Sequence, residues 1–335
     1  MLTITKHCRE KDDIWDAFVM NNSINGTFLQ TRNFLNYHKQ GKFIDCSIQV
    51  SEGLSDIYAV FPACELLEEG KRVFYSHLGS TYGGPVISKK HYNITDVSNM
   101  LDAFETYIRE ERFSKVILKI TPDLFSIEKL DLLKYLLGLR GYYQFSELSS
   151  YIDFSSYNSD IISNFTYSRR KQQKKCIAAG MKFGIIENDD DIRQFHQLLK
   201  NNLAKYNVKP VHTLEELVEF KDQRLFDIIK FYKVVLEDEM VGGGMSFYFN
   251  NTNIMHIQYS AAKQNMGTLS PMTFLFTGLI TDSRDIGASK LSWGISTENK
   301  GKNLNMSLAE TKESYGSKFS LNLTFQKEFT TDFGG

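Results

Sequence analysis

The predicted order of secondary-structure elements repeats in the two halves of this sequence, and this repetition limits the possible folds more than any other feature. In each half, three short hydrophobic runs separated by turn residues predict an antiparallel meander. A glycine-containing loop, a helix, a strand, a second helix and a closing strand follow. In the first half we expect these elements at residues 44–50, 57–66, 72–78, 97–111, 116–120, 127–137 and 142–154.

The second half repeats the plan without repeating the residues. A helix at 161–179, a strand at 182–187 and a helix at 191–206 come first. We expect the repeated elements at residues 231–237, 240–249, 254–261, 270–283, 291–294, 305–315 and 319–325. The sequence therefore predicts two α+β domains, residues 1–155 and 156–335, each with a mixed, mostly antiparallel sheet flanked by helices. Because no low-complexity linker separates them, we expect a large shared interface and a substrate cleft between them.

Composition and charge indicate a globular protein of the cytoplasm. The chain of 335 residues is long for one core, and 42% of it is hydrophobic and 24% charged. The 39 basic and 40 acidic residues nearly cancel, so no overall field attracts nucleic acid. Hydrophobic runs are too short to span a bilayer, and residues 1–20 lack the pattern of a secretory signal. The scattered cysteines Cys8, Cys46, Cys64 and Cys176 indicate a reducing compartment and no metal site.

A polar loop near the C-terminus is the first candidate site. Residues 290–318 predict a buried strand ending at Gly294, a loop of Ser296, Thr297, Glu298 and Asn299, and a helix. Folds built from alternating strands and helices tend to place ligands where a strand ends just before a helix. The hydroxyl, carboxylate and amide groups of this loop can hold a sugar or polarise an acyl group. An ordinary surface loop is the alternative.

Glu298, Lys312 and Tyr315 are the catalytic candidates. An amine that attacks an acyl group must lose a proton, and Glu298 can accept it if a partly dry cleft raises the pKa of its carboxylate. Lys312 and Tyr315 lie three residues apart on one face of the next helix. We expect Lys312 to compensate the charge of Glu298, and Tyr315 to stabilise or protonate the leaving group. Pairing of Lys312 with a surface carboxylate is the alternative.

Several local phrases occur in a characteristic order along most of the chain. They are TFLQT at 27–31 with FLNYH at 34–38, HLGSTYGGP at 77–85, SRRK at 168–171, and WGISTE at 293–298 followed by LN at 304–305 and KESYG at 312–316. In these phrases the sequence resembles the Fem-type branch of the GNAT (GCN5-related N-acetyltransferase) superfamily. The resemblance implies two GNAT-like domains that transfer an acyl group to an amine. It implies acyl-coenzyme A (CoA) or an aminoacyl-tRNA as donor, and often a nucleotide-linked sugar or its peptide as acceptor.

The leading hypothesis is a cytoplasmic N-acyltransferase. It would move an acyl group from acetyl-CoA or another acyl-CoA to an amino group of a nucleotide- or lipid-linked sugar, for a bacterial surface polysaccharide. Direct attack by the amine is expected, because the sequence carries no covalent-nucleophile motif. One alternative is an aminoacyl-tRNA-dependent transferase that acts on a peptidoglycan precursor or sugar. A non-catalytic glycan-binding protein is another.

Eight residues are expected to bind the substrates, and these are His38, Tyr82, Gly83, Gly84, Arg169, Arg170, Trp293 and Ser296. The resemblance implies that a basic residue near His38 contacts the acceptor's diphosphate; a solvated helix cap is the alternative. The glycines after Tyr82 let backbone N–H groups approach a phosphate, or they form an ordinary turn. The crowded cations of helix 161–179 either bind a diphosphate, the 3′-phosphate of CoA or a tRNA backbone, or are solvated.

Five residues are expected to bind the acyl donor, and these are Gln258, Tyr259, Ser260, Gln264 and Gly267. On strand 254–261, strict alternation puts Gln258 and Ser260 on one face and Tyr259 with Ile257 on the other. The resemblance implies that this strand borders the donor and hydrogen-bonds its pantetheine arm; a solvent-facing polar strand is the alternative. CoA-dependent relatives carry a Gln/Arg-x-x-Gly-x-Gly/Ala loop whose N–H groups hold the pyrophosphate. Gln264 and Gly267 match the first half of this pattern, but Leu269 replaces the second glycine.

Overall fold

The computed structural model describes residues 1–39, 41–53, 55–205 and 207–330. The chain forms two compact units, one of Met1–Glu147 with Leu321–Gly335 and one of Leu148–Ser320. The units differ from the predicted domains, because the boundary precedes residue 155 and the last strand returns to the first unit. Strands β9 (Tyr143–Asp153) and β17 (Lys318–Glu328) therefore contribute residues to both units. The predicted α+β class is confirmed.

The strands of the first unit form two sheets. One is antiparallel, in the order β1 (Leu2–Lys6), β3 (Ile48–Glu52), β4 (Asp56–Phe61) and β7 (Val86–Ile87). In the other, residues of β17 pair with β8 (Lys115–Lys119), which is followed by β6 (Lys71–Ser76), β5 (Ala63–Glu68) and β2 (Ile44–Asp45). Within it β6 and β8 are parallel.

The predicted three-stranded meander of the first half is wrong in detail. Run 57–66 is interrupted at Pro62, so β4 and β5 belong to different sheets. Proline has no N–H for a ladder hydrogen bond, which explains the break. Run 44–50 is also interrupted, but without a proline: β2 ends at Asp45, whose carboxylate accepts the Ser47 N–H at 2.8 Å, and β3 begins at Ile48. The two breaks turn one expected meander into two layers.

Helix α3 (Ile94–Glu110) supplies the core of the first unit with its apolar stripe. Asn93 caps it by accepting the Asp96 N–H at 3.0 Å, and the Phe104 ring stacks on Phe61 at 4.4 Å. The other α-helices of this unit are α1 (Asp12–Ala17), α2 (Arg32–Leu35) and α4 (Asp131–Leu139). Short 3₁₀ or π turns lie at Arg9–Lys11, Phe18–Asn22, Phe28–Gln30 and Asp123–Phe125. Helix α4 begins at Asp131, later than the predicted residue 127.

In the larger sheet of the second unit, the strands are antiparallel except for one pair. Its order is β10 (Lys182–Ile185), β11 (Ile229–Leu236), β12 (Glu239–Phe249), β13 (Ile254–Ala262), β14 (Lys290–Ile295) and β9. The exception is β13 with β14, which run parallel because helix α8 (Pro271–Asp285) connects them. The three strands β11–β13 form the meander that the sequence predicts. Its core includes Met255, Leu275 and Leu291.

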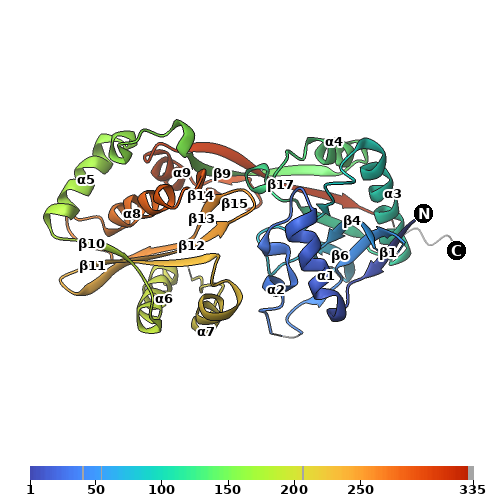
Figure 1. Cartoon of the computed structure of the whole chain (residues 1–335), viewed down its shortest axis with the longest axis horizontal. Helices are drawn as coiled ribbons and strands as arrows, with labels where there is room; N and C mark the ends of the chain where they lie inside the picture. Colours follow the sequence, from blue (N-terminus) through green and yellow to red (C-terminus); the bar gives the residue numbers. More distant parts are fainter. Residues whose placement is uncertain (40, 54, 206, 331–335) are drawn as a thin grey trace. The chain divides into compact units, whose positions relative to one another are not determined.

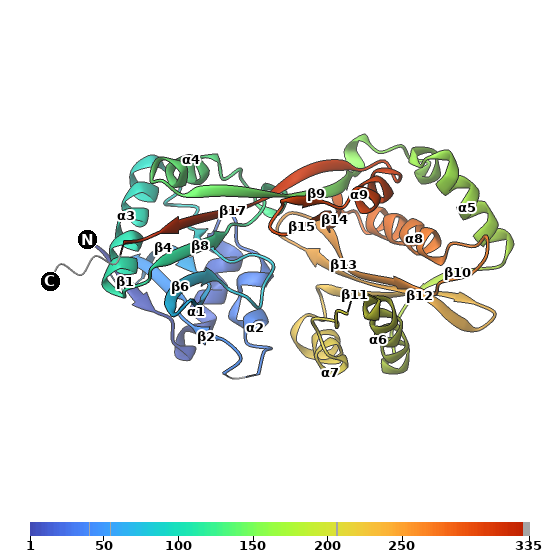
Figure 2. The same ribbon diagram turned by 180° about the vertical axis from the view of Figure 1, so that it is seen from behind.

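Helices cover both faces of this sheet. Helices α5 (Tyr167–Ala178), α8 and α9 (Met306–Glu313) lie on one face, and α6 (Asp189–Ala204) and α7 (Leu214–Glu219) lie on the other (Figures 1 and 2). Predicted helix 161–179 is divided into a 3₁₀ turn, Ile161–Asn164, and α5. Predicted helix 191–206 is α6, although Tyr206 lies outside the described residues. Further short turns lie at Phe154–Ser156 and Phe220–Arg224.

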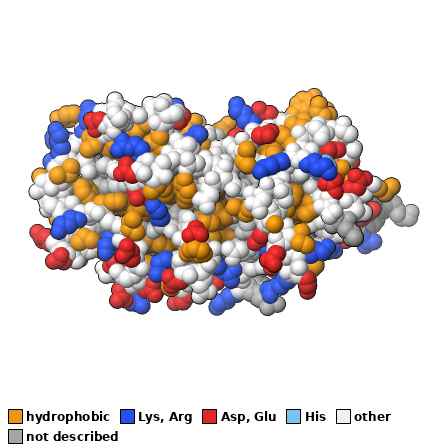
Figure 3. Space-filling model, in the orientation of Figure 1, with side chains coloured by type: hydrophobic (Ala, Val, Ile, Leu, Met, Phe, Trp, Pro, Cys, Tyr) orange, Lys and Arg blue, Asp and Glu red, His pale blue; other side chains and the backbone are white. Residues whose placement is uncertain are grey.

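A two-stranded hairpin of β15 (Thr297–Glu298) and β16 (Asn303–Leu304) replaces the predicted polar loop. Acidic and basic side chains are interspersed on the face seen in Figure 3, in keeping with the near-zero net charge. None of the helices in the described part of the chain combines the length and apolar character of a bilayer span.

Two helical glycines allow a matched test of packing in this fold. A Cβ on Gly278 of α8 would lie 2.2 Å from the Phe183 ring, whereas a Cβ on Gly138 of α4 meets nothing within 4 Å. We expect Gly278→Ala to lower the free energy of unfolding by about 1–3 kcal/mol through overpacking. Gly138→Ala should raise it by about 0.5–1 kcal/mol, because alanine loses less backbone entropy. Urea denaturation measures both; equal effects would contradict the packing of α8 on β10.

Candidate active site

The end of β14 is shaped by a bulge. Ser292 pairs with Tyr151 of β9 and Gly294 pairs with Ser150, so Trp293 is an extra residue. Gly294 has φ of +73°, a conformation that glycine adopts without steric cost. The bulge bends the strand, and the carbonyl groups of Gly294 and Ile295 both face helix α9. The strand that the sequence predicted to end at Gly294 is therefore bent there, and the bend directs these two backbone oxygens toward α9.

Lys312 of α9 is a buried cation held by these carbonyl groups. Its Nζ donates to the Gly294 oxygen at 3.0 Å and to the Ile295 oxygen at 2.7 Å, and the residue is 6% exposed. Burial lowers the pKa of Lys312 to about 8. Among the described residues, no ion pair joins Lys312 to a carboxylate, and Glu298 is bonded to Asn305 instead, so the expected pairing with Glu298 does not occur here. An ammonium has three N–H donors, and these two hydrogen bonds use two of them.

Tyr315 lies in the core rather than at a surface. It is fully buried, contacts the rings of Phe276 and Trp293, and donates its hydroxyl hydrogen to Thr273 Oγ1 at 3.1 Å. Burial raises the pKa of Tyr315. The hydroxyl is thus engaged inside the protein, which fits a role in placing α9 better than the predicted contact with a leaving group.

Arg169 is part of the same packing and is not a solvated surface charge. Its guanidinium lies 5.1 Å from the centre of the Tyr315 ring, and Nε donates to Ser314 Oγ at 2.9 Å. Nη1 reaches Thr273 Oγ1 at 3.3 Å, so Arg169 links α5, α8 and the end of α9. Arg170 donates to the Phe165 carbonyl at 2.6 Å. Both arginines predicted to bind a polyanion therefore also make internal hydrogen bonds.

The hairpin that follows β14 places Glu298 in the open. Its side chain is exposed, and Oε1 accepts a hydrogen bond from Asn305 Nδ2 at 3.2 Å. The partly dry environment on which its predicted proton-accepting role depends is absent. Ser296 is 1% exposed, and its N–H donates to the Leu148 carbonyl at 2.7 Å. In the described part of the chain, Ser296 Oγ and Trp293 Nε1 are buried without a hydrogen-bond partner.

The parallel pairing of β13 with β14 stops early and leaves an unpaired edge. The last pair is His256 with Ser292, although β13 continues to Ala262. Backbone polar groups of residues 257–262 on this side therefore have no partner in β14. Gln258, Tyr259 and Ser260, which the sequence assigned to donor binding, lie along this edge and are half-buried. An extended ligand with amide groups can hydrogen-bond such an edge.

The predicted faces of this strand need one correction. Tyr259 pairs with Met245, and Ile257 pairs with Ser246, so Gln258 is the extra residue of a β-bulge. Beyond a bulge the alternation of faces is reversed. Ile257 belongs to the core beneath α8, whereas the Tyr259 hydroxyl lies 2.6 Å from Nδ1 of His212.

The first turn of α8 offers few N–H groups for a pyrophosphate. Pro271 at the first helical position has no N–H, and the Ser270 N–H points to Cys176 Sγ at 3.3 Å. Ser270 Oγ accepts the Thr273 N–H at 3.3 Å. The preceding loop holds Gly267 at φ +61°, as a glycine-dependent turn requires. The loop therefore lacks the second glycine of the CoA-binding pattern, and most backbone N–H groups at the start of α8 are absent or already hydrogen-bonded.

The glycine-rich loop of the first unit is a packed turn and not a phosphate cradle. The Gly83 N–H donates to the Lys119 carbonyl at 2.9 Å, and its own carbonyl accepts from Gln30. A Cβ on Gly83 would lie 2.8 Å from the Pro62 oxygen, and one on Gly84 would lie 3.0 Å from Pro62 Cδ. Tyr82 is 3% exposed. Close backbone packing therefore explains these glycines, and the Gly83 N–H is not available to an anion.

His38 lies beside a cavity of about 300 Å³ in the first unit. Its Nε2 faces the Gly79 oxygen at 3.3 Å, and its Nδ1 faces Lys42 Nζ at 3.2 Å. Burial, and next the charge of Lys42, lower the pKa of His38 to about 4, so the ring is neutral at pH 7. Because α2 ends at Leu35, His38 is not a helix cap. A neutral ring can hydrogen-bond a diphosphate but cannot neutralise its charge.

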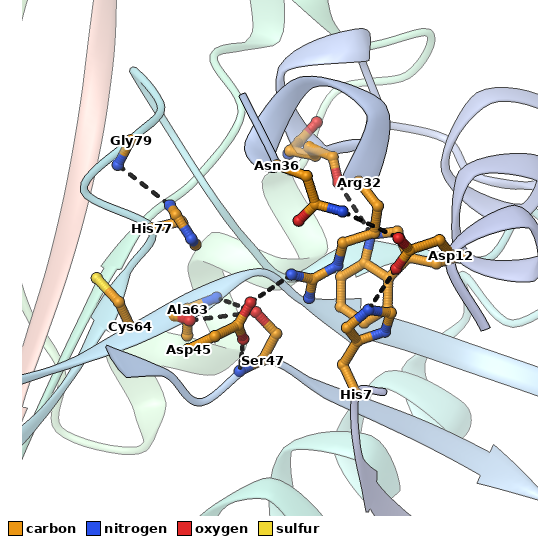
Figure 4. A network of polar contacts seen from close by, with 12 residues as sticks. His7, Asp12, Arg32, Asn36, Asp45, Ser47, Ala63, Cys64, His77 and Gly79 are labelled. Atoms are coloured by element: carbon orange, nitrogen blue, oxygen red, sulfur yellow. Dashed lines mark hydrogen bonds and ion pairs between the residues drawn. The ribbon is translucent and has the colours of Figure 1, made fainter. Parts of the chain in front are cut away.

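The same cavity is lined by a polar network that the sequence did not reveal (Figure 4). Arg32 is 1% exposed, lies over the Trp15 ring at 4.3 Å and donates to Asp45. His77 also lines this cavity, and its Nδ1 accepts the Gly79 N–H at 3.1 Å. These residues are far apart in sequence, so neither spacing nor local pattern could have grouped them.

Comparisons with known proteins identify the fold. No protein-family model and no curated protein matches the chain. The solved structure of FemX matches with a TM-score of 0.68 and 12% identity, over 98% of this chain and 97% of FemX. The C-terminal domain of a putative lysylphosphatidylglycerol synthetase from Agrobacterium fabrum matches at 0.60 and 10%, over 96% and 92%. A tandem GNAT protein from the clavulanic acid biosynthesis pathway matches at 0.57 and 9%, over 99% and 100%.

These likenesses confirm the predicted resemblance at the level of the fold. Both the Fem-type and the tandem GNAT structures cover nearly the whole chain. Identities near a tenth establish architecture, whereas activity depends on the residues of the site. The chain thus has the tandem GNAT-like fold seen in FemX and in the tandem GNAT protein of the clavulanic acid pathway.

Burial of Lys312 should make stability depend on pH. Its pKa is about 8 in the folded protein and 10.5 in an ordinary lysine, so the unfolded chain binds more protons between these values. Stability therefore rises with pH across this window. The free energy of unfolding of the wild type, minus that of Lys312→Met, should grow by at most about 3 kcal/mol from pH 7 to 10. Urea titrations measure it, with Lys302→Met on the neighbouring turn as control. A flat difference would contradict the burial of Lys312.

Proposed function

We propose that this protein is an N-acyltransferase. It moves an acyl group from acetyl-CoA or another acyl-CoA to an amino group of a nucleotide- or lipid-linked sugar in bacterial surface polysaccharide biosynthesis. The observation that carries the proposal is the unpaired edge of β13 beside the bent end of β14, where Lys312 is buried. The tandem GNAT-like fold supports the reaction class, and the sugar and the pathway come from the sequence resemblance.

In the proposed reaction, the pantetheine arm of the donor lies along residues 257–262 of β13. Its amides replace the strand partner that β14 does not supply. The thioester carbonyl then lies near the end of β14, where the third N–H of Lys312 hydrogen-bonds the oxygen as negative charge develops. Because this N–H group is already aimed at the oxygen, no protein dipoles have to reorient during the reaction. The hydrogen bond therefore lowers the activation barrier. Trp293 Nε1 and Ser296 Oγ are further buried donors for a bound substrate.

The amine attacks the thioester directly. Burial raises the pKa of Cys64 to about 11 and also raises those of Cys46 and Cys176, so none of these thiols is activated as a covalent intermediate would require. Orientation of the two substrates supplies much of the rate enhancement. Exposed Glu298 attracts the acceptor in its ammonium form, which releases one proton to solvent before the neutral amine attacks. Tyr315 and Arg169 keep α9, and with it Lys312, in position.

The second candidate function is transfer from an aminoacyl-tRNA to a peptidoglycan precursor or sugar. The start of α8 favours this function. Pro271 has no N–H and the Ser270 N–H is bonded to Cys176, so few backbone donors are left there to bind the pyrophosphate of CoA. Helix α5 favours it as well, since it carries five cations and no acidic residue. Crowded like charges gain from a polyanion nearby. The third possibility, glycan binding without catalysis, requires only the acceptor site.

Calorimetric titration separates the donors. We expect CoA to bind with a dissociation constant of about 1 μM to 1 mM, the range of ordinary substrates. If charged tRNA binds instead, then Lys171→Glu with Lys174→Glu, both exposed on α5, should weaken its binding and flatten its dependence on salt. The same pair should leave CoA binding unchanged. Binding of amino sugars but of neither donor would support the glycan-binding function and overturn the transferase proposal.

Turnover tests the role of Lys312. With acetyl-CoA and a panel of nucleotide-linked amino sugars, Lys312→Met should lower kcat by about 100-fold or more, as loss of one oxyanion donor does elsewhere. The donor KM should change little, since the contact strengthens in the transition state. Glu298→Gln should instead raise the KM of the acceptor. Lys302→Met serves as the control for removal of a nearby charge, and a comparable loss in that variant would argue against a specific role of Lys312.

A further inference from the structure

Tyr259 and His212 form a hydrogen-bonded pair beside the unpaired part of β13. The Tyr259 hydroxyl lies 2.6 Å from Nδ1 of His212, and their ring centres are 5.7 Å apart. His212 is 5% exposed and immediately precedes Thr213, the N-cap of α7. The pair therefore joins the strand expected to hold the donor to the helical layer on the opposite side from α8.

A backbone irregularity builds this pair. Gln258 is the extra residue of the bulge opposite Met245 and Ser246, and it reverses the direction of the next side chain. Without the bulge, Tyr259 would join Ile257 in the core beneath α8. With it, the hydroxyl reaches His212, whose ring packs edge-on against Phe220 at 5.2 Å. Bulges next to active sites commonly re-aim a side chain in this way.

The two side chains can pass a proton in one direction. Burial raises the pKa of Tyr259 to about 12, so its hydroxyl is protonated at neutral pH. In the tautomer whose proton is on Nε2, Nδ1 of His212 accepts the Tyr259 hydroxyl hydrogen across the 2.6 Å contact. His212 also lines a cavity of about 980 Å³, together with Lys200, Asn201 and Thr213. This cavity is open to solvent, so a proton taken up by the imidazole can leave.

We propose that Tyr259 and His212 form the dyad that accepts the proton of the attacking amine. Tyr259 is the catalytic residue that touches the amine, and His212 is a positioning residue that acts through it. This inference rests on the proposed acyl transfer and assigns a step that the transfer leaves open. It is carried by the unpaired strand edge, the bulge, the 2.6 Å contact and the adjoining cavity.

The step balances as follows in atoms and charge. As the amine nitrogen bonds to the thioester carbon, its N–H proton moves to Tyr259 Oη while the original Tyr259 proton moves to His212 Nδ1. The C–S bond then breaks, and the CoA thiolate takes a proton from solvent. The imidazolium returns to neutrality by releasing one proton into the cavity. Each turnover thus forms one amide bond and one thiol, and the dyad ends as it began.

The environment of the dyad suits this role better than that of Glu298. Proton transfer is efficient when acceptor and reacting group are held within hydrogen-bond reach and water is excluded. Tyr259 is half-buried on the donor-binding strand, whereas Glu298 is exposed on a hairpin. Titratable groups near the dyad include His196 of α6, whose Nε2 lies 3.3 Å from the His212 carbonyl, Glu216 of α7, and Lys200, which lines the same cavity as His212.

The test uses full-length protein with acetyl-CoA and the amino-sugar acceptor that the wild type turns over. Tyr259→Phe and His212→Ala should each lower kcat by about 100-fold, the usual loss of general base catalysis, with little change in the donor KM. Added imidazole should restore activity to His212→Ala through the adjoining cavity, which a purely structural role would not allow. Asn201→Ala, which lines the same cavity, should stay within about twofold of the wild type and should not respond to imidazole.

A second readout does not depend on turnover. In ¹⁵N-labelled protein, the His212 Nδ1 resonance should be that of an unprotonated acceptor and should shift in Tyr259→Phe. Wild-type turnover with unimpaired Tyr259→Phe would overturn the dyad and leave the proposed function standing. Failure of imidazole to restore His212→Ala, or a ¹⁵N spectrum unchanged by Tyr259→Phe, would also overturn it. Absence of turnover in the wild type with every donor and acceptor would overturn the function and the dyad together.

Discussion

The short parallel pairing of β13 with β14 is the constraint on which the rest of the second unit depends. Only the stretch from Ile254–Lys290 to His256–Ser292 is paired, although both strands continue. Beyond it, β14 bulges at Trp293 and takes a left-handed turn at Gly294, while β13 bulges at Gln258. Strand twist and these two bulges separate the strands. The separation exposes backbone hydrogen-bonding groups in the interior of the sheet, away from its edge strand β10.

Two cations near this separation are held by neutral groups. Lys312 is bound by two backbone carbonyl oxygens, and Arg169 by hydroxyl groups and the Tyr315 ring. Taking a charge from water costs free energy, and no carboxylate within the described residues offsets that cost for Lys312. The depressed pKa of Lys312 is the measure of this cost. A buried cation such as Lys312 would stabilise a ligand oxygen that acquires negative charge. The free-energy cost of burying Lys312 is therefore consistent with a role in binding a ligand.

The sequence predicted most of the second unit because its signals are local. Three strands separated by Asp-Glu and Asn-Asn turns, and a helix that begins with Ser270 and Pro271, are specified by neighbouring residues. The first unit was predicted less well. Run 57–66 contains Pro62, which has no N–H for a ladder hydrogen bond. This residue was the sequence signal, not used in the prediction, that the run forms two strands. The small turns around α1 and α2 carry no strong periodicity, so they were not predicted.

The candidate site was predicted in part, and the reasons differ from residue to residue. Lys312, Trp293 and Ser296 were chosen together from the sequence, and in the structure all three follow or face the end of one strand. Their burial was not predictable, because it depends on packing between α8, α9 and β14. Glu298 was expected in a dry cleft but is exposed on a hairpin. His212 was not predicted. It is distant from Tyr259 in the sequence, and their contact requires a β-bulge that the simple alternation of side chains along a strand does not predict.

By itself, the sequence determined the order of helices and strands, the repeated plan and the resemblance to tandem GNAT proteins, because hydrophobic periodicity and turn residues act over short distances. Tertiary structure alone decided which edges stay unpaired, which polar groups lose contact with water and which side chains meet. Those outcomes depend on bulges, on strand twist and on contacts between distant segments. The chemistry of the site, including the lowered pKa of Lys312 and the contact between Tyr259 and His212, arises at that second level.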